Sequence, residues 1–413
     1  MPDVSQKKSF HGLVLTHFFT VINDNLYKTL LVFFLLTKVT ESNNALVLSS
    51  VGFLFAAPFI VLAAVAGSLS DKYSKSKIIF LTRIAEIVCT FLGFLGFVLS
   101  SSVLGYITLF LMAAHTAMFA PAKFGILPEM VPSRKMTKCN GIMTSVTYLA
   151  SIIGVFLASF LVHVSSDNFV FSSLFCFVFS IIGFFLSLNI KDTGVCNPAQ
   201  KLHWSFVKDV IVCLQRCRAT PFLVSSILLG GFFLLVGVYT QSALLSFVKS
   251  ELGLEPLYGG YFFLGTAIGI GLGSTFIGYI SGSKVVLGYV PFMALGMCIG
   301  FVFLYVFSSS LISVIFLLFA LGFFGGGFIV PLHAFVQLVS PISYRGQNLA
   351  VSSLIDFVGV LCASGIMFLC GHCLGQASKT GFLIMGCLTL TVTIWMMIGW
   401  REQVKIVFVK NKP

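Results

Sequence analysis

Charged and amide side chains stand in the middle of the first apolar stretch of this sequence. Residues 18–36 are mostly apolar, yet they contain Asp24, Asn25 and, one helical turn later, Lys28. If this stretch crosses a membrane, these groups lie near mid-depth, where a charge costs at least about 2.5 kcal/mol. Such residues usually face a partner or a water-filled cavity. A carboxylate and an amine there can bind a charged solute or neutralise each other, so the stretch is a candidate functional site.

The composition is typical of a protein that is surrounded by membrane lipid. Of the 413 residues, 58% are hydrophobic and only 9% are charged, and the mean hydropathy is +1.04. A soluble domain cannot hide so much apolar surface, because folded proteins already have too few polar groups to cover their outsides. The sequence therefore predicts an integral membrane protein.

About twelve apolar runs approach or exceed the roughly 20 residues that a membrane helix needs. They cover residues 12–36, 45–69, 78–100, 104–128, 141–163, 168–190, 221–247, 257–281, 285–307, 310–331, 346–370 and 380–400. The first run lacks a small-residue cleavage pattern, so we expect it to remain as the first span.

The basic residues lie mainly on one side of these runs. The net charge is +12, yet only Lys38, Lys249 and Lys379 fall on the opposite side, and Lys28, Arg83 and Lys123 fall within runs. The positive-inside rule then puts both termini in the cytoplasm. The basic excess reflects topology, and no nucleic-acid partner is predicted.

The two halves of the sequence resemble each other weakly at a nearly constant offset. The similar segments are 67–70 with 278–281, 124–128 with 327–331, and 154–159 with 359–364. Their shared order predicts two pseudo-symmetric six-helix bundles, residues 1–190 and 221–413. The central segment, 191–220, has apolar residues at helical spacing and predicts a helix along the cytoplasmic membrane surface, with an unstructured linker as the alternative.

A loop motif follows the second run. Residues 67–77 read G-S-L-S-D-K-Y-S-K-S-K, which resembles the major facilitator motif G-x-L-x-D-[RK]-x-G-[RK]-x-[RK] with Ser74 in place of glycine. An acid followed by spaced bases can alternate salt bridges and helix-end contacts, and so can gate the cytoplasmic side. Alternatively, the lysines only anchor the loop inside. The predicted gating residues are Gly67, Asp71, Lys72, Lys75, Lys77, Glu129 and Arg134.

Further segments are similar to the bacterial lysophospholipid transporter family of the same superfamily. They are 19–31 around Asp24, F-A-P-A-K-F-G-I-L-P-E at 119–129, N-G-I-M at 140–143 and G-G-F-I-V-P-L-H-A at 326–334. His333 replaces the family's asparagine, and T-Q-S at 240–242 stands where the family has an arginine.

The resemblance implies a function and a location. It implies the major facilitator fold, an all-α membrane protein with its substrate site at mid-membrane between the two halves. The substrate implied is a lysophospholipid, especially lysophosphatidylethanolamine, which moves by alternating access to the inner leaflet of the bacterial cytoplasmic membrane. A cytoplasmic acyltransferase would then re-acylate it.

The candidate substrate-binding residues suit that substrate chemically. A zwitterionic head group needs a carboxylate for its ammonium and a cation for its phosphate. Asp24 and Asn25 are expected to hold the ammonium, and Lys28 or Lys123 the phosphate. Asp356 lies about 15 Å along its helix from the start of its run, hence also near mid-depth, and we expect it to approach the same site.

Several of these charges have simpler interpretations. Arg83 and Glu86 are three positions apart and are expected to form a local pair rather than bind substrate. Lys123 and Glu129, at the end of the fourth run, could anchor the loop by snorkelling or could act in gating and release.

Other function classes fit less well. The alternative is a proton-coupled carrier of another small solute or drug, with Asp24 or Asp356 as the proton site. An enzyme is not predicted, because residues 163–167 fall one short of the acyltransferase motif H-x-x-x-x-D and no P-loop occurs. The C-G-H-C at 370–373 closes an apolar run instead of following a βαβ unit, so we expect no redox role. No cofactor or metal is predicted.

Overall fold

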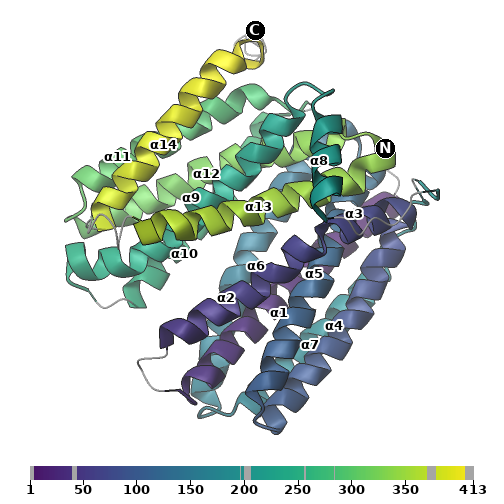
Figure 1. Cartoon of the computed structure of the whole chain (residues 1–413), viewed down its shortest axis with the longest axis vertical. Helices are drawn as coiled ribbons and strands as arrows, with labels where there is room; N and C mark the ends of the chain where they lie inside the picture. Colours follow the sequence, from purple (N-terminus) through teal and green to yellow (C-terminus); the bar gives the residue numbers. More distant parts are fainter. Residues whose placement is uncertain are drawn as a thin grey trace. The chain divides into compact units, whose positions relative to one another are not determined.

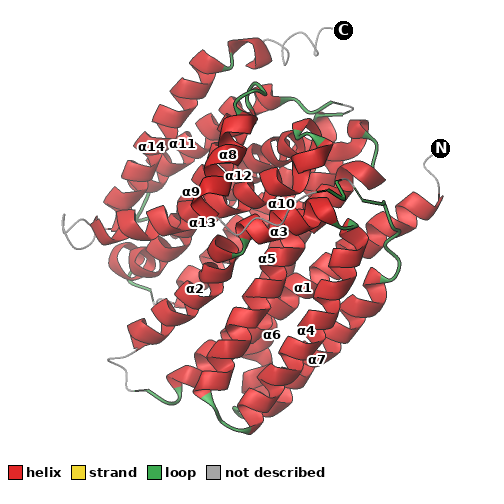
Figure 2. Ribbon diagram, turned by 45° about the vertical axis from the view of Figure 1, so that its right-hand side comes forward, coloured by secondary structure: helices red, strands yellow, loops and turns green. Residues whose placement is uncertain are grey.

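The described part of the chain is built from α-helices. The computed structural model describes residues 4–39, 44–195, 197–199, 206–254, 257–282, 284–369 and 378–404. No strand occurs among these residues, and Figure 2 shows helices joined by loops. The helices in Figure 1 are α1 (Val4–Leu36), α2 (Asn44–Val61), α3 (Ala63–Lys72), α4 (Lys75–Val98), α5 (Ser102–Met130), α6 (Met136–Val164), α7 (Phe169–Ser187), α8 (Phe206–Cys217), α9 (Leu223–Leu252), α10 (Leu257–Ile280), α11 (Val290–Val306), α12 (Leu311–Val339), α13 (Arg345–Phe368) and α14 (Ser378–Gly399).

The helices confirm the predicted spans. Among the described residues, 11 helices are long and apolar enough to cross a membrane, or up to 12 if one bent pair counts as a single span. That pair is the second half of α2 with α3, which meet at an angle of 46° at Leu62. Each predicted apolar run overlaps one of these helices or the bent pair. The prediction of an all-α membrane protein with about twelve spans is therefore correct.

The chain divides into two compact units. Unit 1 comprises Met1–Val131, Ala150–Ala219 and Ser340–Leu354, and unit 2 comprises Pro132–Leu149, Thr220–Val339 and Ile355–Pro413. Two of the five cuts fall within α6 and α13, and each unit includes a short segment from the other half of the sequence. The predicted domain boundaries at residues 190 and 221 stay a prediction.

Unit 1 is assembled around α1 and α5. Helix α1 packs on α7 and α5, while α4 packs on both α5 and α7, and α2 and α3 lie against α5. Leu26, Tyr27, Leu30, Leu31 and Phe34 are almost completely buried on α1. They recur every three or four residues and so form one apolar face. This apolar face packs α1 against the rest of unit 1, and it begins directly after the polar residues around Asp24.

Unit 2 is built around α12, which packs on α9, α10 and α11. Small residues make the contact with α10 close. Any side chain at Gly269 or Gly273 of α10 would overlap the α12 backbone at Phe319 or Phe323. Glycine at these positions lets the two backbones approach, as small residues commonly do between membrane helices.

Candidate functional site: a buried polar cluster in unit 1

The buried face of α1 carries a row of polar side chains. Thr16, Thr20 and Asn23 recur at helical spacing, Asp24 follows, and all four are at most 5% exposed. A buried polar group is unfavourable unless it finds hydrogen-bond partners. The partners come from α1 itself, where Thr20 donates to the Thr16 carbonyl at 2.8 Å, and from α4 and α5.

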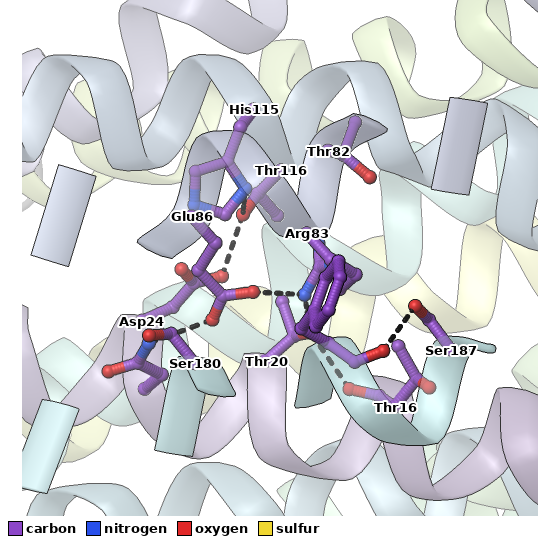
Figure 3. Close-up of polar contacts among 12 residues, drawn as sticks. Thr16, Thr20, Asp24, Thr82, Arg83, Glu86, His115, Thr116, Ser180 and Ser187 are labelled. Carbon is purple, nitrogen blue, oxygen red and sulfur yellow. Dashed lines mark hydrogen bonds and ion pairs between the residues drawn. The ribbon is translucent and has the colours of Figure 1, made fainter. Parts of the chain in front are cut away.

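Asp24 has one hydrogen-bond partner among the described residues. Its Oδ2 accepts from the Thr116 hydroxyl of α5 at 2.9 Å, as Figure 3 shows. Its Oδ1 is buried and accepts no hydrogen bond. Thr116 is partly exposed, whereas Asp24 lies behind it. Oδ1 is therefore a buried acceptor that has no hydrogen-bond partner among the described residues.

An ion pair on α4 lies behind Asp24. Arg83 and Glu86 are fully buried and paired with each other, which confirms the predicted local pair. The pair also reaches α1, because the Arg83 Nη1 donates to Thr20 and the Asn23 amide donates to Glu86 Oε1 at 2.8 Å. Figure 3 shows this chain of contacts between Thr20, Arg83 and Glu86. The ion pair thus fixes α1 on both sides of the turn that precedes Asp24.

Two cations lie over one aromatic ring beside this pair. The Arg83 guanidinium carbon is 4.4 Å from the ring centre of Phe119, and Lys123 Nζ is 5.4 Å from the same centre. Lys123 Nζ also lies 3.4 Å from His17 Nδ1. Only 8% of Lys123 is exposed, so it does not snorkel to the surface as one interpretation of the sequence expected.

Asn25 and Lys28 lie on a more exposed part of α1. The Asn25 amide donates to Ser151 of α6 at 3.3 Å, and Lys28 Nζ donates to Asn25 Oδ1 at 3.4 Å. Lys28 also lies over the Phe55 ring, 5.1 Å from its centre. Lys28 and Asp24, both described, form no ion pair with each other. The direct neutralisation that their spacing allows is absent from this structure.

The end of α3 meets the start of α13 within unit 1. The Asp71 carboxylate accepts from the backbone N–H groups of Gly346 at 2.6 Å and Gln347 at 3.0 Å. An anion at a helix N-terminus satisfies unpaired N–H groups and interacts favourably with the helix dipole. The two helices touch there because Gly67 has no side chain: a Cβ at this position would lie 2.8 Å from Gln347 Cα.

The sequence matches a known family over most of its length. The Major Facilitator Superfamily sequence model matches residues 13–289. The chain belongs to the Major Facilitator Superfamily.

Two similar bacterial transporters align with most of this chain. YfiS of Bacillus subtilis, described as an uncharacterized MFS-type transporter, is 24% identical over 367 residues, which are 84% of this chain and 82% of YfiS. The lysophospholipid transporter LplT of Photorhabdus laumondii is 26% identical over 357 residues, covering 83% of this chain and 84% of LplT.

Solved structures of superfamily members share the fold. The human organic anion transporter MFSD10 has a TM-score of 0.74 at 13% identity, covering 94% of this chain and 99% of its own. The Escherichia coli fucose:proton symporter FucP has a TM-score of 0.73 at 16% identity, covering 96% and 99%. At these identities the likeness supports the fold alone. This protein is accordingly a multi-pass transporter of the Major Facilitator Superfamily.

The superfamily loop in this chain is linked to α5 by ion pairs. Glu129 pairs with Lys75 at 2.6 Å and with Arg345 at 3.9 Å, and its Oε2 accepts from Thr193 at 2.5 Å. The structure therefore brings four of the seven gating candidates, Gly67, Asp71, Lys75 and Glu129, into contacts at the ends of α3, α4, α5 and α13.

Three gating candidates do not join these contacts. Lys72 is partly exposed and lies over its neighbour Tyr73, while Lys77 and Arg134 are exposed. Within the described ranges none of the three forms an ion pair. Their proposed part in gating has no contact in this conformation.

The loop after α7 also contacts this end of unit 1. Asp192 accepts from Ser74, the residue before α4, from Ser76 at 3.1 Å and from the Gly194 N–H at 3.0 Å. These hydrogen bonds, that from Ser74 foremost, lower the pKa of Asp192 below its usual value, because they favour the ionised carboxylate.

Helix α8 packs on the start of α13, also within unit 1. The thiols of Cys213 and Cys217 donate to Asn348 Oδ1 at 3.1 and 3.4 Å, and both cysteines are buried. Arg216 lies over the Tyr344 ring, 4.5 Å from its centre. The two thiols therefore report whether α8 stays on α13.

Asp356 belongs to α13 in unit 2. Its Oδ1 is buried and accepts no hydrogen bond among the described residues. The carboxylate points towards Gly230 of α9, where a Cβ would lie 2.9 Å from Oδ1. Asp356 thus resembles Asp24 in having an unfilled acceptor inside a membrane helix bundle.

The structure tests for metal sites only within the residues that it describes. No group of three or more His, Cys, Asp or Glu side chains in the described ranges could hold a metal ion. The C-G-H-C segment at 370–373 lies outside the described residues.

Proposed function

We propose that this transporter moves a lysophospholipid with a zwitterionic head group, of the lysophosphatidylethanolamine type, across the membrane by alternating access. The observation that carries the proposal is the state of Asp24. It is a buried carboxylate with one unfilled oxygen, and the amine of Lys28, one turn away, is not paired with it. The similarity to LplT, a lysophospholipid transporter, over four-fifths of the chain supports this substrate class.

The head group has complementary partners in this arrangement. The ammonium would bind Asp24 Oδ1 and the side-chain oxygen of Asn25, and the phosphate would bind Lys28 or Lys123. A charged hydrogen bond is roughly twice as strong as a neutral one, so these contacts favour a zwitterion over an uncharged solute. Asp356 is retained as a proposed substrate ligand because it too has a buried, unfilled oxygen.

The contact between α3 and α13 is proposed as the cytoplasmic gate. Gly67, Asp71, Lys75 and Glu129 would hold it closed, and Lys72, Lys77 and Arg134 would take part in another conformation. The proposal includes the topology expected from the positive-inside rule, with both termini in the cytoplasm. It also includes a location in the bacterial inner membrane, where a cytoplasmic acyltransferase would re-acylate the product.

A reconstituted flipping assay tests the proposed function. The purified protein is placed in liposomes with labelled lysophosphatidylethanolamine in the outer leaflet, and the fraction protected from albumin extraction is followed with time. We expect faster protection than in protein-free liposomes, and competition by unlabelled lysophosphatidylethanolamine. Absence of lysolipid movement, together with pH-driven uptake of a soluble solute, would show that the alternative carrier function is correct.

A further inference from the structure

The ion pair on α4 has no part in the head-group contacts proposed above. Arg83 and Glu86 belong to α4, whereas the proposed ligands Asp24, Asn25 and Lys28 belong to α1. Arg83 is 0% exposed and Glu86 is 1% exposed. Replacing such a pair by apolar residues is often neutral for stability, so stability alone does not explain why it is placed beside Asp24.

The pair leaves bonding capacity unused next to Asp24. Arg83 uses Nη1 for Glu86 and Thr20, but its Nε and Nη2 are buried without a hydrogen-bond partner. Asp24 Oδ1 is likewise buried without one. Arg83 and Asp24 are close enough to interact electrostatically, yet they form no ion pair. The unused N–H groups of Arg83 and the unused oxygen of Asp24 therefore belong to the same polar cluster, yet they do not bind each other.

The position of Glu86 explains this separation. Glu86 is held by two groups, Arg83 from its own helix and the Asn23 amide from α1. Asn23 precedes Asp24 directly, so Glu86 binds both the Arg83 guanidinium and the turn of α1 beside Asp24, while Asp24 accepts from Thr116 instead. Two carboxylates, Glu86 and Asp24, could therefore pair with the Arg83 guanidinium, and Glu86 is the one that does.

We propose that Glu86 is a positioning residue that determines head-group specificity: by holding Arg83, it leaves Asp24 free to bind the ammonium of the substrate. This inference rests on the proposed function for its substrate, but its central claim concerns Asp24 and Arg83 alone. Without the Glu86 charge, Arg83 would turn its unused N–H groups to Asp24 Oδ1. The ammonium would then meet a carboxylate that is already neutralised.

The claim predicts opposite effects for single and double substitutions. Glu86→Gln keeps the shape and the Asn23 contact but removes the charge, so the KM for lysophosphatidylethanolamine should rise about ten- to a hundredfold. Lysophosphatidylglycerol has no ammonium, and its KM should change much less. The double variant Arg83→Gln/Glu86→Gln removes the competing cation as well, and should restore the wild-type preference.

Two controls separate positioning from stability. Thr90→Val removes another polar contact of α4, the 3.1 Å contact between Thr90 and Ser180 of α7, and should leave the head-group preference unchanged. Glu86→Asp keeps the charge and should retain the preference. A structural pair would predict that each of Glu86→Gln and the double variant loses activity towards both lipids alike.

A chemical readout tests the claim independently of any substrate. Dicyclohexylcarbodiimide adds to a protonated carboxylic acid in the membrane and leaves an N-acylurea, which peptide mass spectrometry locates. Asp24 exchanges its proton, so the reagent traps the protonated fraction even though the ionised form binds the ammonium. Pairing with Arg83 in Glu86→Gln should lower this fraction, and with it the modification of Asp24, and the double variant should restore it. Unchanged modification in Glu86→Gln would overturn the inference. The expected modification pattern without lysolipid movement by the wild-type protein would contradict the proposed function and leave the positioning role standing.

Discussion

Only one of the two carboxylate oxygens of Asp24 has a hydrogen-bond partner among the described residues. Its single hydrogen bond comes from a neutral hydroxyl, Thr116, and its second oxygen has no partner among the described residues. Water or a ligand group normally satisfies a buried polar atom of this kind. This oxygen without a partner is the observation behind the proposal that Asp24 binds a cationic group.

Asp24→Asn tests that role. The amide has the shape of the carboxylate and can still accept from Thr116, so the fold should be retained. Loss of the charge should lower lysophosphatidylethanolamine flipping at least about tenfold, since a charged hydrogen bond contributes about 1.5–3 kcal/mol. Asp167→Asn, at an exposed turn, is the matched control and should flip lipid normally. Normal flipping by Asp24→Asn would give Asp24 a structural role.

Lys28 distinguishes substrate binding from charge balance. Because Lys28 bonds to Asn25 and not to Asp24, Lys28→Gln should lower the affinity for phosphate-bearing lysolipids without lowering thermal stability. The exposed Lys284→Gln, outside the proposed head-group and gate residues, serves as the control in the same flipping assay. If Lys28 instead balanced Asp24, the double variant Asp24→Asn/Lys28→Gln would be more active than either single variant.

Residue spacing predicted part of this site and missed the rest. The i, i+3 spacing of Arg83 and Glu86 predicted their pairing. The apolar environment of Asp24 made it a candidate site residue, and this stays a prediction. The contacts of the pair with Thr20 and Asn23 join residues 63 positions apart, so they depend on how α4 packs against α1. Lys123 was open to two interpretations, and its burial beside His17 follows from tertiary packing that no local pattern encodes.

At the scale of helices, apolar runs located the spans because hydrocarbon requires about 20 apolar residues for each crossing. The length of the second apolar run did not predict that its helix is bent. The 45–69 run is continuous in hydropathy, yet the structure bends by 46° at Leu62, one turn after Pro58. Hydropathy measures how apolar a segment is, so it cannot predict where the axis of a helix bends.

The contact between α3 and α13 gives a prediction about the gate. Gly67→Ala places a methyl group 2.8 Å from Gln347 Cα and 3.0 Å from the Gly346 carbonyl, so the backbones must separate. We expect a destabilisation of this contact by about 1–3 kcal/mol. Displacement of α13 also removes the Asn348 contact of Cys213 and Cys217, which should then react faster with maleimide. Peptide mass spectrometry identifies the labelled cysteine.

A neighbouring glycine offers the matched control for this gate. Gly52 of α2 has open space around the position of its Cβ, so Gly52→Ala should leave the maleimide rates of Cys213 and Cys217 unchanged. Equal rates in Gly67→Ala and the wild-type protein would show that the α3–α13 contact does not control access to these thiols.

For the whole molecule, the sequence repeat and the compact units describe different divisions. The repeat reflects similar segments in the two halves, whereas the units reflect spatial contacts. Unit 1 includes residues 340–354 because Gly346 and Gln347 hydrogen-bond to Asp71 and Arg345 pairs with Glu129. These contacts join segments that do not resemble each other, so the similarity between the two halves cannot predict them.

Cutting the chain in the central segment tests how far the first half depends on the second. Residues 1–200 alone lack the start of α13, so Asp71 loses both N–H partners and Glu129 loses Arg345. An anion left without its helix N-terminus loses roughly 0.3–2 kcal/mol of stabilisation, and unpaired buried charges add to that loss. Residues 1–200 should therefore be sensitive to proteolysis when expressed alone, and should co-purify with residues 201–413 when the two are expressed together.

Gly67→Val in the first fragment should weaken co-purification, because its side chain meets the Gln347 backbone, and Gly52→Val should not. A monodisperse 1–200 fragment, as resistant to proteolysis alone as in the co-expressed pair, would show that the first half folds without these contacts.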